Sequence, residues 1–137
     1  MTVTAQRTMS LGEAVDQTRN EHINAVNAGD VEASVNQFVA DGVLLPPGAP
    51  ALKGQAAMRG WFTQVFGMFH VQGFNIQPGG VEQMGNLAIE HGNWSATFQP
   101  KDGTPARTGG GTYLTVYVQQ PDGRVLILRD AFNGLPA

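Results

Sequence analysis

One acidic side chain near the carboxy terminus is the first candidate for proton-transfer chemistry. Asp130 lies in an alternating stretch that places it on one face with Leu128 and Phe132. The opposite face carries Ile127, Arg129 and Ala131. If the Asp130 face lines a pocket, the carboxylate loses hydration among apolar side chains, which raises its pKa and suits it to general acid or base catalysis near neutral pH. The alternative is that Asp130 pairs with an arginine or caps the backbone at the end of the sheet.

His22 is the second candidate, because it falls in the apolar stripe of the first helical segment. Its imidazole could titrate or donate a hydrogen bond to a developing oxyanion, and a hydrogen bond to Asp130 would make a base with an orienting partner. The alternative is a satisfied core histidine. We expect His70 to cap the end of a helix, and the facing of His91 stays open. The spacing of these histidines is not typical of zinc or iron sites, and the chain has no cysteine, so we expect neither a metal nor another cofactor.

Tyrosine and threonine side chains are candidates for contacts with a ligand. Tyr113, Thr115 and Tyr117 share one face of a strand. Either this face points inward and the hydroxyls donate to a ligand carbonyl, or the tyrosines are interface residues. Other candidate ligand-binding residues are Trp61, Phe62, Trp94, Phe132 and Asn133. The aromatic residues among them could equally be core, and Asn133 could instead close the last strand.

The elements that must position these residues begin with three helices. Ser10 and Glu13 have the spacing of a capping box, which predicts the start of the first helix. Gly29 and Asp30 predict a C-cap followed at once by the N-cap of a short second helix. A strongly apolar third helix is expected at about 54–69.

Strands follow the helices. The second helix is expected to extend to Val39, with a short strand at 42–47. After the third helix the apolar period changes to two, and the tetrads 101–104 and 121–124 predict turns between neighbouring strands. The segment 78–80, Pro-Gly-Gly, predicts a bulge or bend. Gly109-Gly110-Gly111 lacks the Gly-Lys-Ser/Thr end of a phosphate loop and predicts a flexible entry to a strand.

Composition limits the classes of function. A chain of 137 residues is long enough for one core, and we expect a single domain at 10–134, a flexible start at 1–9 and a tail at 135–137. The net charge is −3 and the eight Lys and Arg residues are scattered, which argues against nucleic acid or an anionic membrane as a partner. No apolar run reaches the ~20 residues of a membrane span. The absence of cysteine favours the reducing cytoplasm.

Several segments resemble, in order, the SnoaL-like branch of the nuclear transport factor 2-like superfamily. They are 27–30, 38–43, 53–58, 111–116, 122–125 and 129–133. The resemblance implies an α+β, cystatin-like cone in which three N-terminal helices pack into a strongly curved mixed or antiparallel sheet. It also implies a pocket at the open end, between the sheet and the first and third helices, with Phe132 in its wall, and a homodimer through the outer sheet face.

The ketosteroid isomerase pattern of this superfamily needs an aspartate base, a tyrosine and a protonated aspartic acid. This chain is expected to have Pro46, His22 and Thr115 at those three positions, so that isomerase activity should be absent. SnoaL-like cyclases use an aspartate, which favours Asp130. The resemblance thus implies cofactor-free acid/base chemistry of the isomerase, cyclase or hydratase type on a small apolar, cyclic or polyketide-like molecule. Asp130 would move the proton, His22 would assist, and Tyr113 or Tyr117 would polarise a carbonyl. The alternative is a non-catalytic ligand-binding or assembly module.

Overall fold

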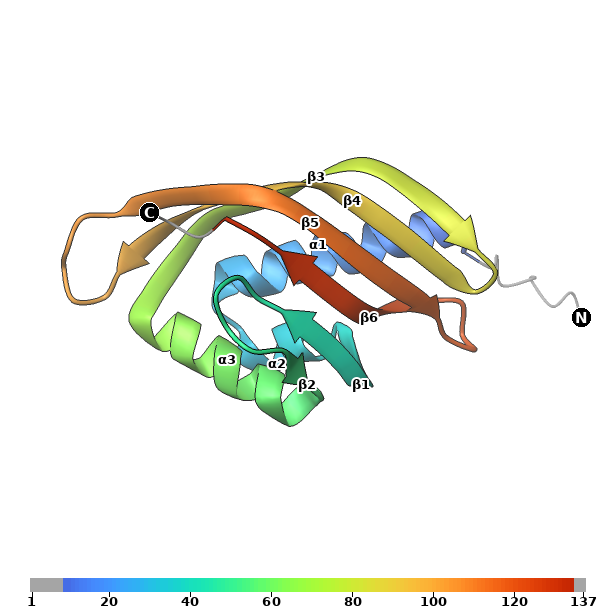
Figure 1. Cartoon of the computed structure of the whole chain (residues 1–137), viewed down its shortest axis with the longest axis horizontal. Coiled ribbons are helices and arrows are strands. Elements are labelled where there is room, and N and C mark those ends of the chain that lie inside the picture. The colour runs from blue at the N-terminus through green and yellow to red at the C-terminus, as the bar shows by residue number, and fades with distance from the viewer. Residues whose placement is uncertain (1–8, 135–137) are drawn as a thin grey trace, which may run out of the picture.

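The computed structural model describes residues 9–134, so the predicted tail and all but the last residue of the predicted flexible start lie outside the described residues. The described chain folds as three helices and six strands. In chain order they are α1 (Leu11–Ala28), α2 (Val31–Val35), β1 (Phe38–Leu45), β2 (Leu52–Lys53), α3 (Gln55–Met68), β3 (Phe69–Met84), β4 (Leu87–Pro100), β5 (Arg107–Gln119) and β6 (Val125–Phe132). The long strands β3, β4 and β5 arch over the helices, with α1 and α3 beneath the curve (Figure 1).

Local signals in the sequence set the boundaries of α1. The Ser10 hydroxyl accepts from the Glu13 amide at 3.1 Å, and the Glu13 carboxylate accepts from the Ser10 amide at 3.3 Å, which confirms the capping box. Gly29 ends the helix with φ +64°, a conformation that glycine adopts without strain. Asp30 then accepts from the Ala33 amide and caps α2, so the predicted corner between the two helices is confirmed.

The predicted extension of the second helix to Val39 is wrong. Helix α2 ends at Val35, and Phe38 already belongs to β1, where it pairs with Ile127 of β6 and is almost fully buried. An apolar Phe-Val pair fits a helix stripe and a buried strand equally well, so pairing with a strand distant in sequence decides the structure here.

The six strands form one mixed sheet in the order β2-β1-β6-β5-β4-β3. Strand β1 runs parallel to β6, whereas every other neighbouring pair is antiparallel. The register between β3 and β4 shifts between Pro78 and Gly80, which confirms the predicted irregularity. A bulge bends and twists a strand, and this one allows β3 to follow the curve of the sheet.

Two predictions at strand ends are wrong. Helix α3 ends at Met68 with Phe69 as its C-cap, so His70 is an exposed residue of β3 and not a helix cap. The glycines at 109–111 lie inside β5 and do not form a flexible entry to it. A Cβ atom on Gly111 would lie 2.2 Å from the Asn133 carbonyl oxygen. The glycine therefore permits a close backbone approach between β5 and the end of β6.

The hydrophobic core lies between the concave face of the sheet and the helices. Its buried members come from α1, α2, α3 and five of the strands, and they include Val15, Val35, Phe38, Met58, Ala88 and Val125. Among the described residues no helix is long and apolar enough to cross a membrane. Toward α3 the core opens into a cavity.

Candidate functional site

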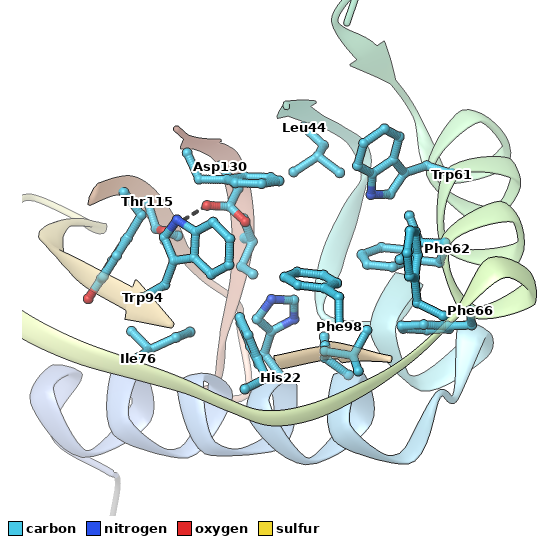
Figure 2. A pocket seen from close by; sticks show the side chains of 18 of the residues that line it. His22, Leu44, Trp61, Phe62, Phe66, Ile76, Trp94, Phe98, Thr115 and Asp130 are labelled. Atoms are coloured by element: carbon cyan, nitrogen blue, oxygen red, sulfur yellow. Dashed lines mark hydrogen bonds between the residues drawn. The ribbon is translucent and has the colours of Figure 1, made fainter. Parts of the chain in front are cut away.

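A cavity of about 340 Å³ lies between the concave face of the sheet and helices α1 and α3. This volume lies within the usual range of small-molecule sites, roughly 300–1,000 Å³. Its wall is mainly aromatic, and its polar members are His22, Arg107, Tyr113, Thr115, Tyr117 and Asp130. Figure 2 shows Asp130 and His22 directed into the same space, the first from β6 and the second from α1.

Nearly all the residues predicted for the site line this cavity. They are His22, Trp61, Phe62, Trp94, Tyr113, Thr115, Tyr117, Asp130 and Phe132. Asn133 does not line it. Its carbonyl oxygen accepts from the Trp94 indole at 2.9 Å, and its side chain bonds with the Thr112 hydroxyl and amide. Asn133 therefore closes the last strand, which was the alternative left open for it.

Asp130 belongs to a row of inward-facing residues that crosses the sheet. Glu90 of β4 pairs with Thr115 of β5, Thr115 pairs with Asp130 of β6, and Asp130 pairs with Leu44 of β1. The Thr115 hydroxyl donates to Asp130 Oδ1 at 2.9 Å. Within residues 9–134 no arginine pairs with Asp130, so the ion pair considered for it is not formed.

The predicted facing of β6 is correct at Asp130 and wrong further upstream. Val116 pairs with Arg129 but Tyr117 pairs with Ile127, so Leu128 is an extra residue in β6. This bulge resets the alternation, and Ile127 faces the cavity where Leu128 was expected. Asp130 and Phe132 lie beyond the bulge and keep a common face.

The cavity changes the proton affinity of Asp130. Burial raises the pKa of this carboxyl from its ordinary 3.8 to about 6, against the hydrogen bond from Thr115, which lowers it. The negative charge of Glu90 adds to the increase in the Asp130 pKa. Asp130 is therefore mainly ionised at pH 7, yet its conjugate acid is accessible close to neutral pH.

A buried cluster that sequence reasoning missed lies beside Asp130. Glu90 is 0 % exposed and accepts from both Nε and the terminal nitrogen of Arg19 on α1. Burial alone would lower the pKa of Arg19, but its hydrogen bonds to Glu90 and Asp16 raise that pKa above its ordinary value. The sequence did carry a signal. Arg19 interrupts the apolar stripe of α1, and Glu90 occupies an inward position between Ala88 and Gly92.

The tyrosines face the cavity, but their hydroxyl groups are engaged elsewhere. The Tyr113 hydroxyl donates to Glu90 Oε1 at 2.9 Å, and that of Tyr117 donates to the same oxygen at 3.4 Å. Burial and the neighbouring Glu90 raise the pKa of both phenols, so they stay protonated. Their rings thus contribute to the wall, while their protons point to Glu90.

His22 is a neutral imidazole in an aromatic environment. Its ring contacts Phe38 and Phe74 edge to face, with centroids at 6.4 and 5.7 Å. Burial lowers its pKa to about 4. Its Nδ1 is buried and has no hydrogen-bond partner among the described residues. The hydrogen bond considered between His22 and Asp130 is not formed among the described residues, where the donor to Asp130 is Thr115.

Comparison with known proteins identifies the family. The profile of the SnoaL-like domain matches residues 20–126. The chain belongs to this family. No curated protein matches it.

Solved structures show that this SnoaL-like protein has the nuclear transport factor 2-like, cystatin-like fold. A conserved protein from Planctomyces limnophilus superposes with a TM-score of 0.82 at 15% identity, covering 90% of this chain and 95% of the other. A ketosteroid isomerase-like protein from Erwinia carotovora atroseptica gives 0.80 at 18% identity, covering 95% and 98%. A Catenulispora acidiphila protein in complex with S-DNPA gives 0.71 at 20% identity, covering 89% and 92%.

The donor set of the SnoaL-like cavity suits proton transfer better than metal binding. Among residues 9–134 no three His, Asp or Glu side chains gather where they could hold a metal ion. Pro46, the predicted counterpart of the isomerase base, is buried and does not line the cavity. Asp130 is the one carboxyl group among the residues that line the cavity. Any acid/base step supplied by a side chain of this wall therefore falls to Asp130 or to the neutral His22.

Proposed function

We propose that this SnoaL-like protein carries out cofactor-free acid/base chemistry of the isomerase, cyclase or hydratase type on a small apolar cyclic or polyketide-like molecule. The observation that carries the proposal is Asp130, a carboxyl in an aromatic wall with a pKa of about 6. A base with a pKa near the working pH is present in its active form and still binds a proton well.

The proposed step is removal of a proton from carbon next to a carbonyl group. The C–H electron pair moves into the carbonyl to form an enolate, and the proton goes to an Asp130 oxygen, which later returns it to another carbon or the same one. Thr115 donates to Oδ1 and orients the carboxylate. His22 stays neutral above its pKa of about 4, so one ring N–H can donate to the ligand oxygen. The tyrosines take no part in polarising the carbonyl, since their hydroxyl groups donate their hydrogen bonds to Glu90.

Deuterium exchange into 2-tetralone tests this proposal. This bicyclic ketone has acidic protons beside its carbonyl, and NMR in D₂O follows their replacement. We expect the protein to accelerate exchange, with a rate that rises with pH through about 6 as Asp130 ionises. Asp130→Asn should abolish the acceleration. Asp41→Asn, which removes an exposed carboxyl from neighbouring β1, should leave it unchanged. Equal exchange in wild type and Asp130→Asn would refute the proposed role.

The second candidate is a ligand-binding or assembly module without catalysis. The engagement of both phenol protons by Glu90 favours it, because the cavity then offers few donors to a developing oxyanion. Saturable binding of 2-tetralone without accelerated exchange would support this candidate over the enzyme.

We also propose that the protein forms a homodimer through the outer face of the sheet. Leu114 is 48 % exposed and lies on this face with Val116 and Val118, opposite the tyrosines. A row across the face begins at Glu82, passes Ile89 and Val116, and ends at Arg129. A two-fold axis along the strands would set the acidic end of one row against the basic end of the other.

Sedimentation equilibrium tests the dimer. Leu114→Glu should give a monomer, since a charge would enter the apolar centre of the interface. Met68→Glu places the same charge on another exposed apolar residue, at the end of α3, and should remain dimeric. A monomeric wild-type protein would refute the proposed assembly.

A further inference from the structure

We propose that the cavity selectively binds protonated apolar amines, with the ammonium group against the Asp130 carboxylate and the hydrocarbon body among the aromatic rings. This ligand class goes beyond the proposed reaction, which needs a carbonyl and no charge. Both proposals depend on Asp130. The reaction needs it to accept a proton from carbon, whereas amine binding needs it to pair with an ammonium group.

Within residues 9–134 the Asp130 carboxylate lies near the negative charge of Glu90 and forms no ion pair. The described residues supply one hydrogen bond, from Thr115 to Oδ1, and no ion pair. The neighbouring Glu90 adds negative charge, and Arg19 is already bound to Glu90 and Asp16. A partly buried carboxylate without a counter-ion favours a ligand that brings a positive charge.

The arginine in the cavity wall, Arg107, forms no ion pair with Asp130. Arg107 is exposed at the start of β5, whereas Thr115, the partner of Asp130, lies eight residues further along that strand. Among the described residues no ion pair joins Arg107 to Asp130, so Arg107 does not serve as its counter-ion. His22 adds no positive charge at neutral pH, because burial lowers its pKa to about 4.

Aromatic rings around Asp130 complete a site suited to an organic cation. Trp94 and Phe132 meet edge to face with centroids 5.6 Å apart, and both line the cavity. Tyr113 and Tyr117 flank Thr115 on the same strand face. Ring faces attract ammonium groups, and a carboxylate with aromatic walls recognises such groups more strongly than either does alone. Because the tyrosine hydroxyls donate to Glu90, the phenol groups offer no competing proton at this place.

Three compounds of one shape test the proposal by calorimetry at pH 7.5: 2-aminotetralin, 2-tetralol and tetralin-2-carboxylate. They carry an ammonium group, a hydroxyl group and a carboxylate at the same position. We expect the amine to bind about tenfold or more tightly than the alcohol, as a charge-assisted hydrogen bond implies, and the carboxylate to bind least well. Asp130→Asn should bring the amine to the level of the alcohol, while Asp41→Asn should retain the preference.

A pH series on the wild-type protein gives a second measurement that needs no variant to fold. The preference for the amine should disappear as pH falls below about 6 and Asp130 takes up a proton. The other titratable or charged groups of the wall and its backing are His22, Arg19, Glu90, Arg107, Tyr113 and Tyr117. The tyrosines and Arg19 hold their protons across this range, because the pKa of each is raised, and the pKa of His22 is lower, at about 4.

Three results would overturn the inference. One is equal affinity for amine and alcohol in the wild type, the second is a preference that survives Asp130→Asn, and the third is tightest binding of the carboxylate, which would indicate Arg107 as the anchor. Deuterium exchange into 2-tetralone is measured separately from amine binding, so the proposed reaction and the amine site can fail independently. Loss of exchange with the amine preference intact would reject the reaction alone, and the reverse would reject the amine site alone.

Discussion

Replacing Glu90 by glutamine should destabilise the fold and change the acidity of the cavity together. The glutamine side chain would keep the volume and an oxygen for the tyrosine hydroxyls, but the substitution removes the charge that faces Arg19 in a fully buried pair. Breaking a buried ion pair on one side costs about 3–5 kcal/mol, because the remaining charge is left without compensation. Arg19 retains its bond to Asp16 at 2.7 Å, so we expect the lower end, about 3 kcal/mol.

A double-mutant cycle separates the ion pair from the general cost of mutating a core. Removing both charges in Arg19→Met with Glu90→Gln leaves no uncompensated ion, so the double variant should lose less stability than Glu90→Gln alone. Urea denaturation gives the free energies of unfolding, and an unchanged m-value shows that the unfolding transition is comparable. Glu32→Gln is the control, because it removes the acid from the exposed pair with Arg59 and should have no measurable effect.

The same Glu90→Gln variant should lower the pKa of Asp130. The charge of Glu90 contributes to the raised pKa of Asp130, so its loss favours the ionised carboxylate, as does the unbalanced Arg19 that remains. Carboxyl-carbon NMR follows the titration of Asp130 directly. The reasoning fails if the double variant is at least as unstable as the single one, or if the Asp130 midpoint stays at its wild-type value.

Three further predictions concern single contacts. Thr115→Val keeps the volume but removes the hydrogen bond that lowers the Asp130 pKa, so the midpoint measured by NMR should rise above about 6, and a fall would contradict the assignment. His22 has a pKa of about 4 in the folded state against 6.5 ordinarily, so its contribution is complete above pH 6.5 and decreases by up to about 3 kcal/mol as pH falls through 4. His22→Phe should flatten that acid-side loss in urea denaturation, and an unchanged slope would refute the cause. Gly111→Ala would place Cβ 2.2 Å from the Asn133 carbonyl oxygen and should cost about 1–3 kcal/mol, while Gly60→Ala, in open space on α3, should stabilise by about 0.5–1 kcal/mol in the same assay.

Local signals in the sequence were sufficient for α1, α3, the start of α2 and most of the strands. The capping box at Ser10, the corner at Gly29 and Asp30, and the change of period after α3 each depend on residues close together in the chain. The errors arise where distant pairing decides. Phe38 joins a strand because β6 lies beside it, and the bulge at Leu128 follows from the fit of β6 against β5.

The sequence predicted which residues line the candidate site better than it predicted the role of each residue. Alternation grouped Tyr113 with Thr115 on one strand and Asp130 with Phe132 on another but left the facing of the tyrosines open, and the structure shows all four lining one cavity. Strand pairing determines which of them touch, and the sequence does not specify it. Thr115 donates a hydrogen bond to Asp130, and Glu90 accepts the hydrogen bond that Tyr113 was expected to offer a ligand. A buried charge in an inward strand position was the signal for Glu90, but its partner on α1 is 71 residues away.

The two carboxyl groups in the inner row of the sheet show how environment separates structural from chemical roles. Glu90 accepts hydrogen bonds from an arginine and two phenols, so its oxygens are already engaged by the protein. Asp130 is two strands away in the same row and has a single hydroxyl donor and an open cavity in front of it. A carboxyl without an ion pair in an apolar wall gains or loses its proton according to the charge of the ligand that enters. A charged ligand that enters beside Asp130 should therefore shift the proton affinity of Asp130, so the titration of this carboxyl distinguishes a cationic ligand from a neutral one.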